Sequence, residues 1–272
     1  MYKTGFMELR FLSFGCANPD VPVGPPRCQR HLWSSIVMAT LHGAADNRLL
    51  AALPNSDRRR ILADCETVEL TLAQVLCAPW VPRNCIYFPT SSSISLTMPT
   101  DDSAAFEVGL IGNEGMLGIA LVLDAELSPE RAVVQGAGSA LRMDAAPLRR
   151  ELRRSKALRG AVDRYVHIRM SQLAQAAICA HFHLLESRLA RRLLMSQDRA
   201  HANTFNVTQE VLALKLGVRR VGVTKAASSL QRRRLIRYSR GDITVLDRSG
   251  LMVASCGCYQ ADRESYERIR CQ

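Results

Sequence analysis

The chain has 272 residues and a net charge of +11 at pH 7; 47% of its residues are hydrophobic and 22% are charged. This composition predicts a folded protein with one large or two modest domains, and it argues against a largely disordered chain. No run of about 18 apolar residues is present, which argues against a membrane-spanning helix. Nine scattered cysteines are too few for a secreted disulfide scaffold.

The charge is divided unevenly along the chain. Residues 1–144 contain 11 Lys and Arg against 15 Asp and Glu, a net charge of −4, whereas residues 145–272 contain 25 against 10, a net charge of +15. Such a basic half favours a polyanionic partner, either a nucleic acid or a membrane surface.

The first 37 residues differ in composition from the rest. Four prolines occur in the nine residues 18–26, which favours an extended, unpacked chain. A signal peptide fits poorly, because Glu8 and Arg10 interrupt the apolar stretch and no A-x-A-like cleavage site follows. We therefore expect residues 1–37 to be a disordered extension, with Met38 as an alternative start of the natural protein.

Short apolar segments separated by Pro, Ser, Asn and Gly recur after residue 66, a spacing typical of a β-sandwich or β-barrel. Two short helices are expected before them, at residues 47–53 and 57–63. The expected strands are residues 68–70, 75–77, 85–88, 94–98, 106–111, 131–135 and 140–143.

A glycine-rich segment with four glycines in ten residues, from Gly109 to Gly118, lies among these strands. Glycine lets the backbone adopt positive φ and approach a ligand closely. Together with Arg131, such a turn can cradle a phosphate or a carboxylate. Alternatively, the glycines only make tight turns and Arg131 is an exposed or ion-paired strand residue. No GxxxxGK[ST] or GxGxxG motif supports a nucleotide-triphosphate or dinucleotide site.

The segment from residue 144 to residue 200 predicts helices, because Asp144 and Pro147 form a helix start and no proline follows as far as Arg199. We expect helices at residues 146–154, 156–181 and 184–200. A stripe on the middle helix either packs on the β-rich domain or pairs with a second copy as a dimer seam. The stripe consists of Leu158, Val162, Tyr165, Arg169, Gln172 and Ala176.

The sharpest local pattern is a helix-turn-helix. Thr208 caps a short helix, and Gly217 ends that helix in the left-handed conformation that a tight turn needs. A second helix runs from Arg219 to about Arg233. Cations in its first turn oppose the helix dipole and need a compensating anion, such as DNA phosphate.

Two further strands, at residues 235–238 and 243–246, flank a short turn and predict a β-hairpin. A hairpin directly after a helix-turn-helix is a winged helix-turn-helix. The alternative for the whole segment is an ordinary helix corner with exposed arginines.

The sequence resembles the Crp/Fnr family of bacterial transcription regulators. The segments that carry the resemblance are 186–195, 208–220 and 235–243. It implies an α+β fold: an N-terminal antiparallel β-roll (jelly-roll-like), a long dimerisation helix and a C-terminal winged helix-turn-helix. It also implies a cytoplasmic homodimer that binds double-stranded DNA and contacts RNA polymerase, with no enzymatic activity. No H-E-x-x-H, G-x-S-x-G or S-x-x-K motif favours an enzyme. A ligand-sensing protein-interaction module without specific DNA binding is the alternative.

The composition and the resemblance together divide the chain into five parts. They are a disordered extension (1–37), a cyclic-nucleotide-binding-like β-roll sensor domain (38–143), a linker and dimerisation helix (144–182), a winged helix-turn-helix DNA-binding domain (183–255) and a tail (256–272).

The resemblance also assigns DNA contacts. Thr208 and Gln209 match positions that hold backbone phosphate. The surface that faces the bases corresponds to Arg219, Arg220, Val221 and Lys225. Arg220 and Lys225 are candidates for guanine contacts. Val221 stands where many members have Glu, so the target sequence is expected to differ from theirs.

The effector site matches the family less well. Members that bind cyclic AMP have a Glu in the glycine-rich turn and an Arg-Ser pair on the phosphate, where this chain has Met116 and Arg131-Ala132. Leu173-Ala174 replaces a Thr-Ser pair that meets adenine, so we expect no tight cyclic AMP binding. A different small effector and no effector at all both stay open. The expected effector-binding residues are Gly115, Met116, Gly118 and Arg131.

The cysteines do not show the spacing of the oxygen-sensing relatives, which hold an iron–sulfur cluster with closely spaced N-terminal cysteines. Cys16 and Cys28 are separated by eleven residues, so we expect no such cluster. Cys256 and Cys258, with Cys271, form only a weak metal motif because no second pair is nearby in the sequence. We expect free thiols in a reducing cytoplasm and no bound cofactor or metal.

The remaining candidate ligands are two histidines at the end of the long helix. His181 and His183 are two residues apart, so they point to different faces of the helix and are poor partners for one metal ion.

Overall fold

The computed structural model describes residues 46–99 and 105–271 of the chain. The expected extension over residues 1–37, the alternative start at Met38 and the spacing of the two N-terminal cysteines lie outside the described residues.

Two short helices open the described part, α1 (Arg48–Ala51) and α2 (Asn55–Ala63). Asn47 begins α1, because its side-chain oxygen accepts hydrogen bonds from the backbone of Leu49 and Leu50 at 3.1 and 3.3 Å. Both helices were expected from the sequence.

Two antiparallel sheets follow, with strand orders β1-β7-β3 and β2-β6-β4-β5. Leu70 and Ala140 from the first sheet pack in one core cluster with Ile94 and Val134 from the second. All the expected strands are present, and the expected β-roll fold is confirmed. The strands are β1 (Glu66–Leu70), β2 (Val75–Cys77), β3 (Cys85–Pro89), β4 (Ser93–Pro99), β5 (Ala105–Ile111), β6 (Arg131–Gly136) and β7 (Gly138–Asp144).

A short helix that the sequence pattern did not predict, α3 (Ile119–Val122), lies between β5 and β6. It starts at Gly118, whose φ of 114° lies in the left-handed region. Leu121 and Val122 are buried in the core that also holds α1 and α2.

The next helices are α4 (Ala145–Arg154), α5 (Lys156–Phe182) and α6 (Leu185–Ala200). Asp144 precedes α4 as expected but does not cap it; its carboxylate pairs with Arg142 at 3.0 Å. Ser155 caps α5 by accepting a hydrogen bond from the backbone of Leu158 at 3.0 Å. This serine is the reason for the break between α4 and α5.

The α5 helix carries two different faces. Leu158, Val162 and Tyr165 of the expected stripe are buried in the core beneath the β-roll, which favours the packing role for that stripe. Apolar side chains on the C-terminal half of α5 are exposed instead. They are Met170, Leu173, Ile178 and Phe182.

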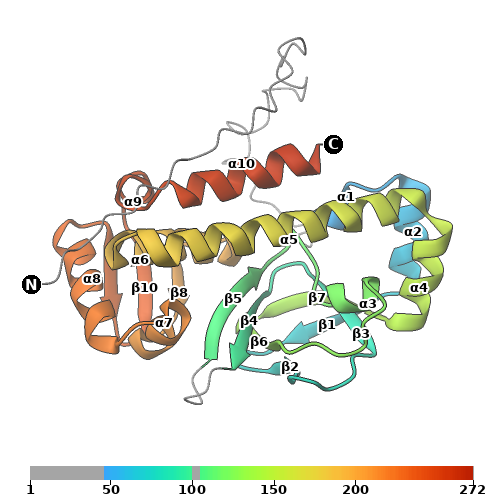
Figure 1. Cartoon of the computed structure of the whole chain (residues 1–272), viewed down its shortest axis with the longest axis horizontal. Coiled ribbons are helices and arrows are strands. Elements are labelled where there is room, and N and C mark those ends of the chain that lie inside the picture. Colours follow the sequence, from blue (N-terminus) through green and yellow to red (C-terminus); the bar gives the residue numbers. More distant parts are fainter. Residues whose placement is uncertain (1–45, 100–104, 272) are drawn as a thin grey trace, which may run out of the picture. The chain divides into compact units, whose positions relative to one another are not determined.

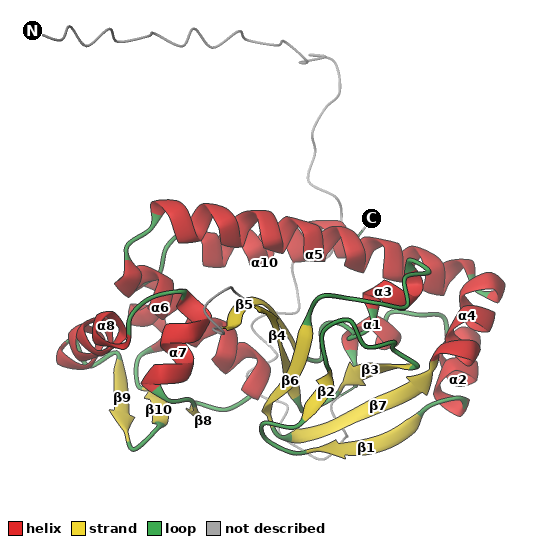
Figure 2. Ribbon diagram, turned by 60° about the horizontal axis from the view of Figure 1, so that its bottom comes forward, coloured by secondary structure: helices red, strands yellow, loops and turns green. Residues whose placement is uncertain are grey.

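A small sheet, in the order β8-β10-β9, joins two helices to form the winged helix-turn-helix (Figure 2). The sequence pattern did not predict the strand β8 of this sheet. These elements are β8 (Thr204–Asn206), α7 (Gln209–Leu216), α8 (Arg220–Arg232), β9 (Ile236–Ser239) and β10 (Asp242–Val245).

Two helices end the chain, α9 (Arg248–Ala254) and α10 (Cys258–Arg270). α10 packs along α5 (Figure 1) and buries Cys258, Tyr259 and Ile269. None of the described helices combines the length and apolar character needed to span a membrane.

Candidate nucleic-acid interface

The turn between α7 and α8 has the geometry of a helix-turn-helix. The Thr208 hydroxyl accepts a hydrogen bond from the backbone of Val211 at 3.2 Å, which caps α7 as expected. Gly217 ends α7 with φ of 63°, and its backbone N–H reaches back to the last turn of α7. Arg219 is the N-cap residue of α8, so the connection between the helices is three residues long.

One face of α8 is held against α6. Val223, Ala227 and Leu230 belong to the same core cluster as Leu189 and Leu193 of α6. This burial fixes the rotation of α8 about its axis, so the opposite face has to point to solvent.

That opposite face carries the residues expected to meet DNA bases. Arg219, Arg220, Val221 and Lys225 are all exposed, Val221 with 64% of its surface. Within the described part of the chain, no carboxylate pairs with any of the three cations. The face is therefore rich in positive charge that the rest of the described chain does not neutralise.

The two residues expected at the DNA backbone lie at the start of α7. Gln209 is half-buried, and its Oε1 accepts a hydrogen bond from the Thr224 hydroxyl on α8 at 2.6 Å. Thr208 is exposed while its hydroxyl caps α7. The bond to Thr224 brings the start of α7 next to the exposed face of α8.

The hairpin of β9 and β10 turns through two residues, Arg240 and Gly241, which have φ of 52° and 90°. Two successive positive φ values define a type I′ turn, whose twist suits a two-residue hairpin. Arg237 and Arg240 are exposed on this wing. The sequence pattern predicted the hairpin but did not single out these two arginines; an Arg-Gly pair at the turn was the available signal.

The helix-turn-helix is fastened to the β-roll through one buried carboxylate. Glu107 on β5 pairs with Lys215 of α7 at 2.7 Å and with Arg192 of α6 at 2.9 Å. The Ser95 hydroxyl donates to the same carboxylate at 2.5 Å, and Gln135 accepts from both cations. None of these links was visible in the sequence, because the partners are 85 and 108 residues apart.

Burial and ion pairing shift the pKa values in this network in opposite directions. Burial raises the pKa of Glu107, but the charges of Arg192 and Lys215 outweigh it and hold the pKa below its usual value. Burial lowers the pKa of Lys215 to about 8, and the attraction of Glu107 offsets only part of that change. The charged form of Lys215 is thus less favourable in this network than in water.

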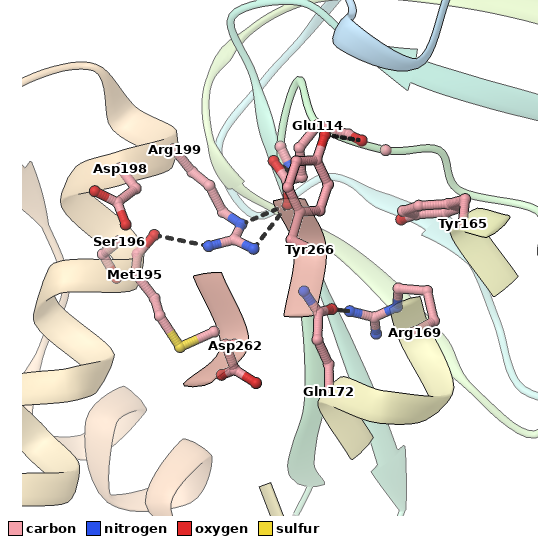
Figure 3. A network of polar contacts seen from close by, with 12 residues as sticks. Glu114, Tyr165, Arg169, Gln172, Met195, Ser196, Asp198, Arg199, Asp262 and Tyr266 are labelled. Atoms are coloured by element: carbon pink, nitrogen blue, oxygen red, sulfur yellow. Dashed lines mark hydrogen bonds and ion pairs between the residues drawn. The ribbon is translucent and has the colours of Figure 1, made fainter. Parts of the chain in front are cut away.

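A second buried link joins the end of α6 to the glycine-rich segment (Figure 3). Arg199 pairs with Glu114 at 2.7 Å, and the Tyr266 hydroxyl of α10 donates to the Glu114 backbone carbonyl at 3.4 Å. Burial lowers the pKa of Arg199, but the charges of Glu114 and Asp198 together with the hydrogen bond to Glu114 outweigh it, so the pKa is raised.

The glycine-rich turn expected to hold an effector is packed against α5. The Tyr165 hydroxyl donates to the Met116 carbonyl at 3.3 Å, and a Cβ added to Gly115 would lie 2.2 Å from the Tyr165 oxygen. The Met116 side chain is wholly buried in the core. Gly118 supplies the left-handed turn, whereas Arg131 is exposed at the start of β6.

A cationic pocket lies instead between β5, α5, α6 and α7. Arg169, on α5, is only 8% exposed and donates to Gln172 at 2.7 Å (Figure 3). No carboxylate among the described residues pairs with it. Its guanidinium rests on Gly109, where an added Cβ would lie 1.9 Å from a guanidinium nitrogen. The charged lining residues are Glu107, Arg169, Arg188, Arg191, Arg192 and Lys215.

A cluster of thiols and one imidazole lies where α10 begins. Cys179 and His183 at the end of α5 meet Cys256 and Cys258, so the structure supplies the second pair of ligands that the sequence lacks nearby. As expected, His181 does not join His183. Cys271 lies at the opposite end of α10 from Cys258.

Comparison with known proteins identifies the class. Residues 187–253 match the Crp-like helix-turn-helix domain, which covers α6 to α9 with the wing. No curated protein matches the chain by sequence. The domain and its geometry define a DNA-binding transcription regulator.

Solved structures extend the similarity to the β-roll. A transcriptional regulator of the Crp/Fnr family from Eubacterium rectale is 16% identical, with a TM-score of 0.61 over 76% of this chain and 97% of its own. FixK2 from Bradyrhizobium japonicum is 12% identical, with a TM-score of 0.61 over 71% and 98%. The c-di-GMP-responsive global regulator CLP of Xanthomonas campestris is 15% identical, with a TM-score of 0.55 over 71% and 99%. The chain therefore has the Crp/Fnr fold, and the resemblance found in the sequence is confirmed.

Proposed function

We propose that this regulator binds a two-fold symmetric DNA site as a homodimer, with one α8 helix in each of two successive major grooves. The observation that carries the proposal is the exposed face of α8, where Arg219, Arg220 and Lys225 have no acidic partner among the described residues. In this proposal Arg220 and Lys225 contact guanine and Val221 contacts a thymine methyl group. Thr208 and Gln209 lie at the phosphate backbone.

The homodimer is supported by the exposed side of α5. Met170, Leu173, Ile178 and Phe182 give the second half of this helix an apolar surface that no described element covers. Exposed apolar groups at helical spacing favour pairing with a second helix. Two copies of α5 side by side would bury this surface and set the distance between the two recognition helices.

The further parts of the proposal follow from the resemblance to the family. They are action in the cytoplasm, contact with RNA polymerase and the absence of enzymatic activity.

We also propose that a small anionic effector modulates the protein from the cationic pocket. The support is Arg169, a nearly buried cation with no carboxylate partner in the described chain, beside the pair that joins Glu107 to Lys215. The glycine-rich turn is a poorer site, because Tyr165 and Met116 fill it. Cyclic AMP is not the proposed effector, since Met116 and Ala132 lack the polar groups that the resemblance requires for it.

The experiment that tests DNA binding is selection from a randomised duplex library with the purified full-length protein. We expect enrichment of a palindromic site with half-sites about one helical turn, roughly 10 base pairs, apart. Affinity for that site is expected to fall steeply with salt, because Lys and Arg release counterions from phosphate. No enrichment, with and without a panel of phosphate-bearing nucleotides, would contradict the proposal.

The dimer is tested by sedimentation of Ile178→Glu, which places a charge in the apolar surface of α5. We expect this variant to be monomeric and to lose affinity for the palindromic site. Val253→Glu is the control, because Val253 is also an exposed apolar residue and lies on α9, outside that surface.

A further inference from the structure

Four side chains from two distant segments meet at the junction of α5, α6 and α10. Cys179 lies in the last turn of α5, and His183 is the residue that ends this helix. Cys256 and Cys258 lie at the break between α9 and α10. The three sulfur atoms and one imidazole nitrogen all lie within 4.8 Å of one another.

The distances within the cluster suit a single metal ion. Cys179 Sγ lies 3.5 Å from Cys256 Sγ, and Cys258 Sγ lies 3.4 Å from His183 Nδ1. A tetrahedral Zn²⁺ ion, with Zn–S of about 2.3 Å and Zn–N of about 2.0 Å, needs ligand atoms about 3.5–3.8 Å apart. An iron–sulfur cluster, which places several iron atoms among its cysteines, would hold these sulfur atoms farther apart.

The local structure explains why these residues can converge. Cys179 and His183 are four residues apart, so they lie on one face of the helix end. Cys256 and Cys258 flank a single glycine at the start of α10, which lets both thiols face the same point. The three cysteines are buried and form an apolar cluster of their own, apart from the larger cores.

A neighbouring side chain outside the cluster donates a hydrogen bond to one of the sulfur atoms. Gln175, one turn before Cys179 on α5, donates its side-chain N–H to Cys258 Sγ at 2.9 Å. A hydrogen bond from outside a set of ligands orients them and stabilises the charge of a bound thiolate.

We propose that Cys179, His183, Cys256 and Cys258 bind one Zn²⁺ ion. Three thiolates and an imidazole are a soft ligand set that selects zinc over magnesium or calcium. Four protein ligands fill the tetrahedral shell and leave no open position, so the ion has a structural role.

The site ties the C-terminal helix to the junction between α5 and α6. Beyond the cluster, α10 is fastened by the pair of Asp262 with Arg191 and by the bond from Tyr266 to Glu114. The metal anchors the first turn of α10, where these contacts begin. Removing it frees α10 and lowers the stability of the folded chain.

The experiment uses the full-length protein, stripped with a chelator and titrated with Zn²⁺ or with Co²⁺ as a spectroscopic probe. We expect one ion per chain and the absorption bands of tetrahedral cobalt with thiolate ligands. Cys256→Ser and Cys258→Ser are expected to lose about 100-fold or more in metal affinity. Cys271→Ser and His181→Asn are the matched controls on the same two helices, and both are expected to bind as the parent does.

Three results would overturn the proposal. One is wild-type protein that takes up less than half an equivalent of zinc, and another is equal loss in Cys271→Ser and Cys256→Ser. The third is iron and sulfide bound at these cysteines in place of one zinc ion.

A measurement on the wild-type chain alone tests the site even if the serine variants fail to fold. Thiol alkylation with and without chelator, followed by peptide mapping, identifies the cysteines that the metal protects. We expect metal-dependent protection of Cys179, Cys256 and Cys258 only. Protection of Cys65, Cys77 or Cys85 instead would contradict the site.

Discussion

The arginines of α6 and those of α8 are used in opposite ways. Arg192 and Arg199 on α6 are buried and each faces a carboxylate, Glu107 or Glu114. The cations on the outer face of α8 are exposed and have no carboxylate partner within the described residues. The fraction of Lys and Arg is similar in both helices, so the density of cations in the sequence does not separate them.

The α6 arginines are neutralised by carboxylates of the chain itself, whereas the α8 cations are left for an external anion. A buried cation without its carboxylate would lower the stability of the folded chain, so the α6 pairs hold α6 against β5 and the glycine-rich segment. An exposed cation at a helix start is disfavoured only mildly, and an external anion reverses that preference. The α6 arginines are thus expected to affect folding, and the α8 arginines DNA affinity.

The largest effect is expected where a buried pair is broken. Glu107→Ala leaves Lys215 and Arg192 buried without their carboxylate, which we expect to reduce the free energy of unfolding by about 3–5 kcal/mol. Urea unfolding measures this loss. Glu66→Ala is the control, since the pair of Glu66 with Arg142 is exposed and worth about 1 kcal/mol or less. Equal losses in the two variants would remove the distinction between buried and exposed pairs.

On α8 the same kind of change is expected to act on DNA affinity alone. Arg220→Ala should cost about 1–3 kcal/mol in binding to the selected site and relax the preference at one base pair, with unfolding unchanged. Fluorescence anisotropy on matched and substituted sites measures both. Arg268→Ala on α10 is the control, because Arg268 is also exposed and its replacement removes the same charge. Equal weakening by both variants would indicate a general charge effect.

The features of this structure that the sequence predicts are those fixed by contacts between residues close together in the chain. The boundaries of α7 and α8 were predicted within about one residue, because Thr208 and Gly217 act on their own neighbours. The short strand β8 was missed because its pairing partner, β10, begins 36 residues later. The Cys179–Cys256 contact spans 77 residues and has no local signal. The exposed position of the α8 residues was predictable, whereas the Glu107 network and the approach of Cys179 and His183 to Cys256 and Cys258 were not.

The contrast between buried and exposed cations is also expected in the pH dependence of stability, through Lys215 and Lys225. Lys215 on α7 is buried, with its pKa lowered to about 8 from 10.5, whereas Lys225 on α8 is exposed. Between these two values the unfolded chain binds more protons than the folded chain at Lys215, so stability rises with pH in that window, by less than about 1.4 kcal/mol per pH unit. Below pH 8 both states hold the proton and this contribution to the slope vanishes.

Urea unfolding between pH 7 and pH 10, on the parent and on two variants, isolates that contribution. Lys215→Met removes the titrating group, so the rise is expected to shrink, and Lys225→Met should leave it as in the parent. An unchanged rise in Lys215→Met would assign the pH dependence to other groups.

The smallest effect is expected at the tip of the wing. Arg240 has φ of 52°, a conformation that Asn adopts more readily than other residues with side chains, so Arg240→Asn removes the charge without straining the turn. If Arg240 touches phosphate, the slope of log affinity against log salt falls by about 1, equally on specific and random DNA. Thermal unfolding should be unchanged, because no described residue pairs with this side chain. A loss confined to the selected site would mean that the wing reads bases, as α8 is proposed to do, and would extend the recognition surface beyond one helix.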